Sequence, residues 1–348
     1  MNLAVEIVVV VILLVPLAVV TVGTWVGPRL HAQLPAWAEL DTTRNNLEHA
    51  ADYRTAALGS LGQVVRRGSG SRDVVLIAGW GYGADVFEGF MRSNQQRYRM
   101  VAVTLPGFAG TPAPPMPPAG TSYGERTWTA AAERALAELI VVERLDHPII
   151  VGHFNVGAQI ALRVALDHPD HVGGVVVVGG TLHAPFPSRR DSTGRTPVTP
   201  EERVAGVDRF WAPRWFKFVT EETWRRGNYQ AEHYSVDRAR GLARVEEADR
   251  VPLPVLIQYV CEYFASDLSQ ELSKLRVPVT ALVPGFRPEV LADSALAMGA
   301  QAFAASWRPA AGHPRVNVVT VSGSGVFVMD DRPEELHRAV AELAGSRH

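Results

Sequence analysis

The sequence predicts an α/β fold with a doubly wound, mostly parallel sheet. Short apolar runs, such as Asp73 to Ala78 and Val172 to Val178, alternate along the chain with segments of helical period. Strands that are apolar on both faces are typical of parallel sheets covered by helices on both sides. A Gly-rich turn, Gly79 to Gly83, follows the first of these runs directly. Such turns are common at the carboxyl ends of strands that enter a helix.

Composition excludes several alternatives. The chain has 348 residues, of which 47% are hydrophobic and 20% are charged. This composition is ordinary for a globular protein, and the length suits one large α/β domain with an insertion. The formal net charge of −2 gives no electrostatic argument for binding nucleic acid. Cys261 is the only cysteine, so we expect no intramolecular disulfide and a packed core thiol.

The N-terminus contains an apolar segment, Ile7 to Val26, without any charged residue. About 20 residues in a helix span about 30 Å, the thickness of a bilayer's hydrocarbon core. A cleaved signal peptide is the alternative, but the preceding MNLAVE carries no Lys or Arg. We therefore predict a transmembrane anchor over residues 1–29, followed by a polar juxtamembrane connector over residues 30–58.

An anchor of this kind predicts a single-pass protein of the cell membrane. The nearest flanking positive side chain, Arg29, lies on the C-terminal side, which leans toward a cytoplasmic main domain. A membrane-protein partner is a further hypothesis. The helix offers Gly23 but no G-x-x-x-G pair, so it indicates no specific interface.

The remaining elements follow in order. The predicted strands are Gln63 to Arg67, Asp73 to Ala78, Met100 to Leu105, Pro148 to Val151, Val172 to Val178, Pro278 to Val283 and Val316 to Val321. The predicted helices are Ala84 to Gln95, Tyr123 to Leu145, the segment after Gly157, residues 288–304 and Pro333 to Ala344. Residues 111–120 are rich in proline and predict an irregular loop.

The strand pattern is interrupted between residues 184 and 270. This segment is richer in charge, Trp and Pro, which predicts a helical lid inserted into a core of residues 59–183 and 271–348. Its aromatic residues either form the lid's own small core or line an apolar pocket beneath it. They are Phe210, Trp211, Trp215, Phe216, Phe218 and Trp224.

Four motifs in this order resemble those of the α/β-hydrolase superfamily. Residues 78–81 (AGWG) resemble the turn that helps to build the oxyanion hole, and residues 105–110 (LPGFAG) resemble the D-x-P-G-x-G turn. Residues 151–158 (VGHFNVGA) resemble the nucleophile elbow, G-x-S-x-G. Residues 321–333 resemble the C-terminal segment that carries the catalytic histidine. The resemblance covers about residues 60–345 and implies a lid-containing α/β-hydrolase fold.

The side chains of the triad implied by this resemblance are absent. Phe154 stands in the serine position and Val326 in the histidine position. The turn at residues 284–288, where the acid is expected, has no carboxylate before Glu289. Neither a phenyl ring nor an isopropyl group can act as nucleophile or base.

The elbow itself requires a strained backbone conformation. Phe154 suits it poorly, whereas Asn155 tolerates a positive φ much better. We therefore predict that the turn shifts so that Asn155 takes the positive φ. This shift does not restore chemistry, because a neutral amide is not a useful nucleophile.

His183 is a weak candidate for a general base, because it follows a strand and should lie near the pocket mouth. It would need an orienting carboxylate, such as Glu289 or Asp293. A hydrogen-bonded structural histidine is the alternative, and His153 is expected to be structural as well. No His/Cys cluster has the spacing of metal ligands, so we expect no metal and no cofactor.

Two functions remain. The first is a membrane-anchored, catalytically degenerate protein that binds a small apolar ligand or acts as a structural or interaction subunit. The alternative is an α/β-hydrolase-family enzyme, esterase-like or other, with a non-standard catalytic group: His183, Asn155 or the backbone N–H groups near Trp80. The simultaneous apolar replacement of nucleophile and base favours the first. In either case the expected pocket lining is Gly79, Trp80, Gly81, Phe154, Asn155, His183, Val326 and Phe327.

Overall fold

The computed structural model describes residues 61–186, 189–191, 194–196 and 198–345. The predicted anchor over residues 1–29 and the connector over residues 30–58 lie outside the described residues. No helix among the described residues is both long enough and apolar enough to cross a membrane.

A seven-stranded sheet forms the centre of the molecule, in the order β1-β3-β2-β4-β5-β8-β9. Its strands are β1 (Gln63–Arg67), β2 (Arg72–Ile77), β3 (Tyr98–Thr104), β4 (Ile149–His153), β5 (Gly174–Val178), β8 (Val279–Pro284) and β9 (Val316–Val321). Every neighbouring pair in this sheet is parallel except β1 with β3. The predicted mostly parallel α/β sheet is therefore confirmed.

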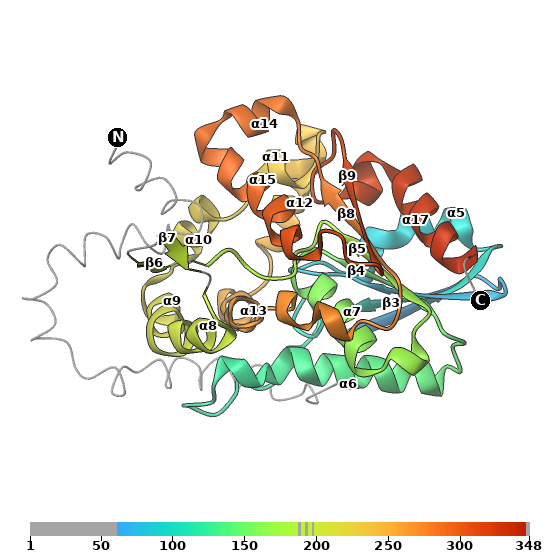
Figure 1. Ribbon diagram of the computed structural model, residues 1–348, viewed down its shortest axis with the longest axis horizontal. Helices are drawn as coiled ribbons and strands as arrows, with labels where there is room; N and C mark the ends of the chain where they lie inside the picture. The colour runs from blue at the N-terminus through green and yellow to red at the C-terminus, as the bar shows by residue number, and fades with distance from the viewer. Residues whose placement is uncertain (1–60, 187–188, 192–193, 197, 346–348) are drawn as a thin grey trace, which may run out of the picture.

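Helices cover both faces of this sheet, giving three layers (Figure 1). The helices α6 (Thr127–Val142) and α7 (Val156–Asp167) lie on one face, and α5 (Glu88–Asn94) and α17 (Pro333–Gly345) lie on the other. The single helix predicted over residues 288–304 is two helices, α14 (Pro288–Ala292) and α15 (Ser294–Ser306).

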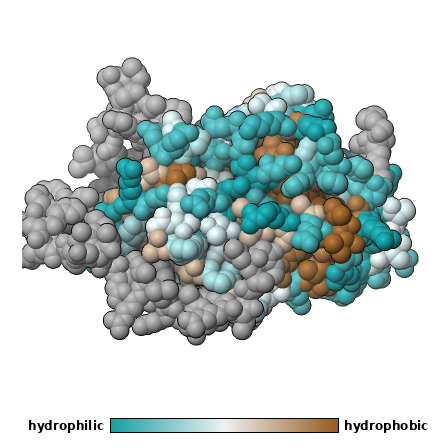
Figure 2. All heavy atoms as spheres, turned by 90° about the horizontal axis from the view of Figure 1, so that it is seen from below, coloured by the Kyte–Doolittle hydropathy of each residue, from teal (hydrophilic) through white to brown (hydrophobic). Residues whose placement is uncertain are grey.

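Burial follows position in the sheet. The four valines of β5, in the middle of the sheet, have no exposed surface, as expected for a strand covered on both sides. At the edge, β9 keeps exposed positions and leaves Val318 40% accessible. Figure 2, which views the molecule from the side of α6, shows a mostly hydrophilic surface with a limited hydrophobic patch.

The segment between β5 and β8 is mostly helical, as predicted. It also contains a hairpin of two short strands, β6 (Arg189–Asp191) and β7 (Gly194–Thr196), which the sequence pattern did not indicate. Its α-helices are α8 (Pro200–Gly206), α9 (Ala212–Phe218), α10 (Glu221–Gly227), α11 (Ala231–Tyr234), α12 (Arg238–Ala248) and α13 (Leu253–Ala265). We call α8 to α13 the lid helices; domain boundaries at residues 184 and 270 stay a prediction. In Figure 1, α8, α9 and α10 lie to the left of the sheet.

Candidate active site

The elbow between β4 and α7 keeps a strained turn. Asn155 has φ 49° and ψ −100°, and it is the last residue before α7. The prediction that Asn155 takes a positive φ is therefore confirmed. Phe154, however, also has a positive φ, of 40°, so the turn does not shift to relieve it. Residues held in such sparsely populated regions cost on the order of 1–3 kcal/mol each and cluster at functional sites.

Two glycines flank this turn and explain its shape. A Cβ on Gly152 would lie 2.5 Å from the Cβ of Ala161, and one on Gly157 would lie 3.0 Å from the carbonyl oxygen of Ile77. Both glycines therefore permit the close approach of α7 to the sheet. The stretch from Gly152 to Gly157 is one residue longer than G-x-S-x-G. Two successive residues of this turn, Phe154 and Asn155, have a positive φ.

The turn at residues 79–81 lies directly against the elbow through Gly79. A Cβ on Gly79 would lie 2.1 Å from the carbonyl oxygens of both His153 and Phe154. Trp80 has φ 40° and its buried ring meets the Phe154 ring edge-on at 6.3 Å. The backbone of this turn and the N-terminus of α7 are therefore adjacent. The first amides of a helix have no acceptor inside it, and the helix dipole favours negative charge there.

Aromatic side chains surround the elbow and make it apolar. The Phe154 ring is fully buried and lies 5.4 Å from Tyr229, 5.9 Å from Tyr234 and 6.2 Å from Phe303, measured between ring centroids. Tyr229 and Tyr234 belong to the lid region and were not singled out by the sequence. The concentration of aromatic residues in that region is the only feature of the sequence that could have indicated these two tyrosines.

The loop that corresponds to the catalytic-histidine segment lies beside the elbow. Val326 and Phe327 are fully buried, and a Cβ on Gly179 would lie 2.5 Å from the Val326 carbonyl oxygen. The Phe327 ring lies 4.6 Å from the ring of His153. The structure thus places Gly79, Trp80, Val326 and Phe327 around Phe154 and Asn155, whereas that they line a pocket stays a prediction.

His153 lies at the end of β4 among aromatic rings. Burial lowers the pKa of its imidazole to about 3, and the nearby charge of Arg244 lowers it further, while the Val326 main chain opposes the shift. The ring is therefore neutral at physiological pH. This supports the structural role expected for His153.

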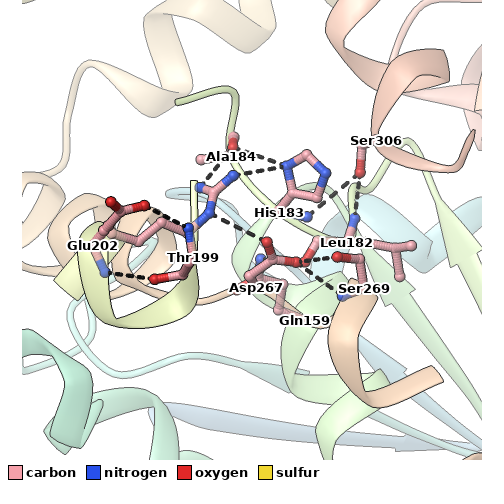
Figure 3. Close-up of polar contacts among 10 residues, drawn as sticks. Gln159, Leu182, His183, Ala184, Thr199, Glu202, Asp267, Ser269 and Ser306 are labelled. Carbon is pink, nitrogen blue, oxygen red and sulfur yellow. Dashed lines mark hydrogen bonds and ion pairs between the residues drawn. The ribbon is translucent and has the colours of Figure 1, made fainter. Parts of the chain in front are cut away.

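His183 belongs to a different polar cluster, shown in Figure 3. Its Nδ1 lies 3.0 Å from the carbonyl oxygen of Ala184 and 3.3 Å from Nη2 of Arg203 on α8. Arg203 also forms a buried ion pair with Asp267, at 3.2 Å. Burial lowers the pKa of His183, and Asp267 acts in the opposite direction. Asp267, rather than Glu289 or Asp293, is therefore the carboxylate that influences this histidine.

The polar groups at the elbow are Asn155 and Tyr229. Asn155 is 1% exposed, and its Oδ1 has no hydrogen-bond partner among the described residues. Burial raises the pKa of Tyr229 to about 12, and hydrogen bonding with the Asn155 side chain opposes the shift. The phenol is therefore a neutral hydrogen-bond donor near neutral pH. Among the described residues, no group of three or more His, Cys, Asp or Glu side chains could hold a metal ion.

The chain is similar to several esterases. It is 31% identical over 128 residues to the pimeloyl-[acyl-carrier protein] methyl ester esterase of Photorhabdus laumondii, covering 37% of this chain and 42% of the relative. The esterase of the same name from Nitrosomonas europaea is 26% identical over 217 residues, covering 60% of this chain and 74% of the relative. The chain thus spans less than half of the first relative.

Solved structures share the fold. The esterase EaEST from Exiguobacterium antarcticum superposes with a TM-score of 0.55 at 18% identity, covering 81% of this chain and 95% of that one. A bromoperoxidase from Bacillus anthracis gives the same TM-score at 16% identity and the same coverage. At these identities the likeness shows the fold alone.

The comparisons overturn the catalytically degenerate binding or interaction subunit predicted from the sequence. The relatives are named as esterases, which favours the alternative of a hydrolase-family enzyme. The prediction from the sequence treated the loss of all three triad side chains as the loss of all chemistry. The strained elbow and its backbone N–H groups are retained, and such groups can stabilise developing negative charge without a serine.

The prediction of a single-pass cell-membrane protein is also overturned. Its segment, Ile7 to Val26, lies outside the described residues. The matched relatives are named as esterases rather than as membrane anchors or membrane subunits. The prediction depended on the hydropathy of this segment, and the names of the relatives do not support it.

One family model accounts for most of the chain. The model described as the alpha/beta hydrolase family matches residues 74–339, which include the sheet from β2 onward, the elbow and the lid helices. This match agrees with the four motifs and with the order of strands. The chain belongs to the alpha/beta hydrolase family.

Proposed function

We propose that this protein is an ester hydrolase that stabilises the oxyanion at its elbow and uses water, rather than a serine, as the nucleophile. The observation that carries the proposal is the retained strain at Asn155, which stands at the N-terminus of α7 beside the Trp80 turn. Strain of this kind persists only where the surrounding structure enforces it. The esterase names of the relatives support the same reaction class.

The reaction needs few groups. A hydroxide ion, formed from water and regenerated when the departing alkoxide takes its proton from water, adds to the ester carbonyl carbon, and the carbonyl oxygen takes up the negative charge. The backbone N–H groups at the start of α7 and in the Trp80 turn, with the Asn155 amide and the Tyr229 hydroxyl, are the donors proposed to stabilise that charge. The C–O bond to the alcohol then breaks, and the departing alkoxide takes a proton from water. The products are a carboxylic acid and an alcohol.

The expected rate is modest. Triad enzymes that have lost a triad member retain roughly 10³–10⁴-fold catalysis over water, through the oxyanion hole and binding. We expect an acceleration of that order here. The aromatic rings around Phe154 favour a substrate with an apolar acyl group. In this proposal, that acyl group is the small apolar ligand expected from the sequence.

The test is turnover of p-nitrophenyl esters and of a dicarboxylic acid methyl ester by the full-length chain. Asn155→Gly keeps the positive φ accessible while removing the amide donor. We expect it to lower kcat about 10²–10³-fold, the range observed on loss of one oxyanion donor. Asn317→Ala, on the exposed part of edge strand β9, is the control and should leave turnover unchanged.

A serine-directed phosphonate provides a second control, because the proposed reaction should persist in its presence. Turnover that the phosphonate abolishes would show that a serine nucleophile is present. Activity equal to that of buffer, or equal in the wild type and Asn155→Gly, would refute the proposal.

A further inference from the structure

Several buried polar atoms around the elbow have no hydrogen-bond partner among the described residues. Two of them belong to the turns that meet there: Nε1 of Trp80, which is 3% exposed, and Oδ1 of Asn155, which is 1% exposed. Buried polar atoms in native proteins are nearly always bonded to the protein or to ordered water. The indole of Trp307, for example, donates to the carbonyl oxygen of Gly180 at 2.9 Å. The two atoms at the elbow therefore point to a bound ligand.

The backbone fixes both side chains beside the same ring. Gly79, directly before Trp80, lies so close to the elbow that an added Cβ would be 2.1 Å from the carbonyl oxygen of Phe154. The Trp80 ring meets the Phe154 ring edge-on at 6.3 Å, and Asn155 is the next residue along the chain. Trp80 and Asn155 have φ values of 40° and 49°, which only the surrounding structure can enforce.

The chemistry of the two atoms identifies the ligand. An indole N–H can only donate a hydrogen bond, and an amide oxygen can only accept one. A ligand that meets both atoms must accept from Trp80 and donate to Asn155, which excludes a metal cation and a fully ionised anion. It must also be small, because the rings of Tyr229 and Tyr234 pack around Phe154. Water meets both requirements.

We propose that Trp80 and Asn155 bind the water molecule that becomes the attacking hydroxide. This inference rests on the proposed function. The bound water loses one proton to a hydroxide ion of the solvent. Its oxygen keeps the hydrogen bond from Nε1 of Trp80, and its remaining hydrogen is donated to Oδ1 of Asn155. That oxygen then forms the new bond to the ester carbonyl carbon.

The Asn155 amide can serve both oxygens of the tetrahedral intermediate. Its Nδ2 donates and its Oδ1 accepts, and the two atoms lie side by side in one planar group. The intermediate likewise presents the former carbonyl oxygen, which carries the negative charge, beside the O–H that came from water. Asn155 therefore stabilises the charge and holds the attacking oxygen with the same side chain.

The first test is a crystal structure of the full-length chain. One water should lie about 2.7–3.2 Å from both Nε1 of Trp80 and Oδ1 of Asn155. Trp80→Phe and Asn155→Gly each remove one of the two contacts, and both should lack this water. The matched control is Trp215→Phe, which should retain it. The indole nitrogen of Trp215 is also buried without a partner among the described residues, but its ring packs on Phe264 at 5.2 Å, away from the elbow.

The second test is the kinetics of the same variants. Trp80→Phe should lower kcat for p-nitrophenyl butyrate about 10–100-fold, the loss expected for one hydrogen bond to a charged group, and leave KM within about twofold. Trp215→Phe should change neither. Added hydroxylamine, whose nitrogen attacks methyl butyrate to give a hydroxamic acid, competes with hydroxide. Because only hydroxide depends on Trp80, the ratio of hydroxamic to carboxylic acid should rise at least about tenfold in Trp80→Phe. An unchanged ratio would show a merely structural effect and overturn the inference.

The two tests separate this inference from the proposed function. Esterase activity in a protein whose crystal structure has no water at these two atoms would overturn the water site and leave the proposed function standing. A water bound to both atoms in a protein without any esterase activity would refute the proposed function, and with it the role of that water in catalysis. Equal losses of kcat in Trp80→Phe and Trp215→Phe would also overturn the inference.

Discussion

Acidification should destabilise this protein through His153, which stands directly before the elbow. Burial holds the pKa of its imidazole at about 3, below its ordinary value of 6.5. The folded state therefore binds the proton more weakly than the unfolded chain does. The stability contributed by the neutral ring is fully present above pH 6.5 and is lost as the pH falls toward 3.

The magnitude follows from the size of this shift. Each pKa unit corresponds to about 1.4 kcal/mol, so a shift from 6.5 to about 3 is worth about 5 kcal/mol in full. Between pH 6.5 and pH 4.5 the unfolded chain takes up the proton and the folded protein does not. This interval alone should cost about 2 kcal/mol.

The measurement is urea unfolding, followed by tryptophan fluorescence, at pH 7.5, 6.5, 5.5 and 4.5. Because other groups also titrate, the informative quantity is the difference in unfolding free energy between the wild type and His153→Leu. The unfolding free energy of the wild type should fall, relative to that of His153→Leu, by about 1.4 kcal/mol for each pH unit below 6.5. His153→Gln, a second non-titrating variant, guards against a packing effect of leucine. A difference that stays constant over this pH range would refute the reasoning.

Three further predictions concern ionisation and packing. Burial raises the pKa of Glu133 to about 7 from 4.5, so its contribution is fully present below pH 4.5 and is lost as the pH rises through 7. The loss should approach about 3 kcal/mol, and Glu133→Gln should abolish this part of the pH dependence in urea unfolding. Gly79→Ala should destabilise the fold by at least about 2 kcal/mol in the same assay, because its Cβ would meet two backbone oxygens at 2.1 Å. The control, Gly89→Ala, has no atom within 4 Å of the new Cβ and should be neutral or stabilising. Finally, the rate of ester hydrolysis, measured by pH-stat titration, should rise about tenfold per pH unit from pH 7 to 9, because hydroxide takes the place of a protein base. Burial raises the pKa of Tyr229 to about 12, so its hydroxyl stays protonated over this range. A plateau in that range would indicate a protein base.

Most of the sheet follows from local sequence. Continuous apolar runs such as Val172 to Val178 have to be buried on both faces, so they predict inner parallel strands without reference to distant residues. The turns at residues 79–81 and 152–157 were likewise recognisable from their glycines. Gly79, Gly152 and Gly157 are required by close backbone approaches, and Gly81 by its φ of 88°.

The elbow was only partly predictable. The positive φ of Asn155 followed from its tolerance of left-handed conformations, but the sequence did not show that Phe154 would share that conformation. The surrounding structure decides this point. The carbonyl oxygen of Phe154 lies against Gly79, and its ring packs among side chains from the lid and from α15. Packing of this extent can hold a residue in a conformation that its own propensity disfavours.

The sequence by itself determined the fold class, the succession of strands and helices along the chain and the position of the elbow, because each depends on the periodicity and backbone preferences of neighbouring residues. Only the tertiary structure decided what covers the elbow and what surrounds each candidate residue. Trp224 meets Trp80 from a distant part of the chain, and Arg203 and Asp267 reach His183 from separate lid segments. Contacts across such separations leave no periodic pattern in the sequence. They arise when the lid helices fold back over the carboxyl ends of the strands.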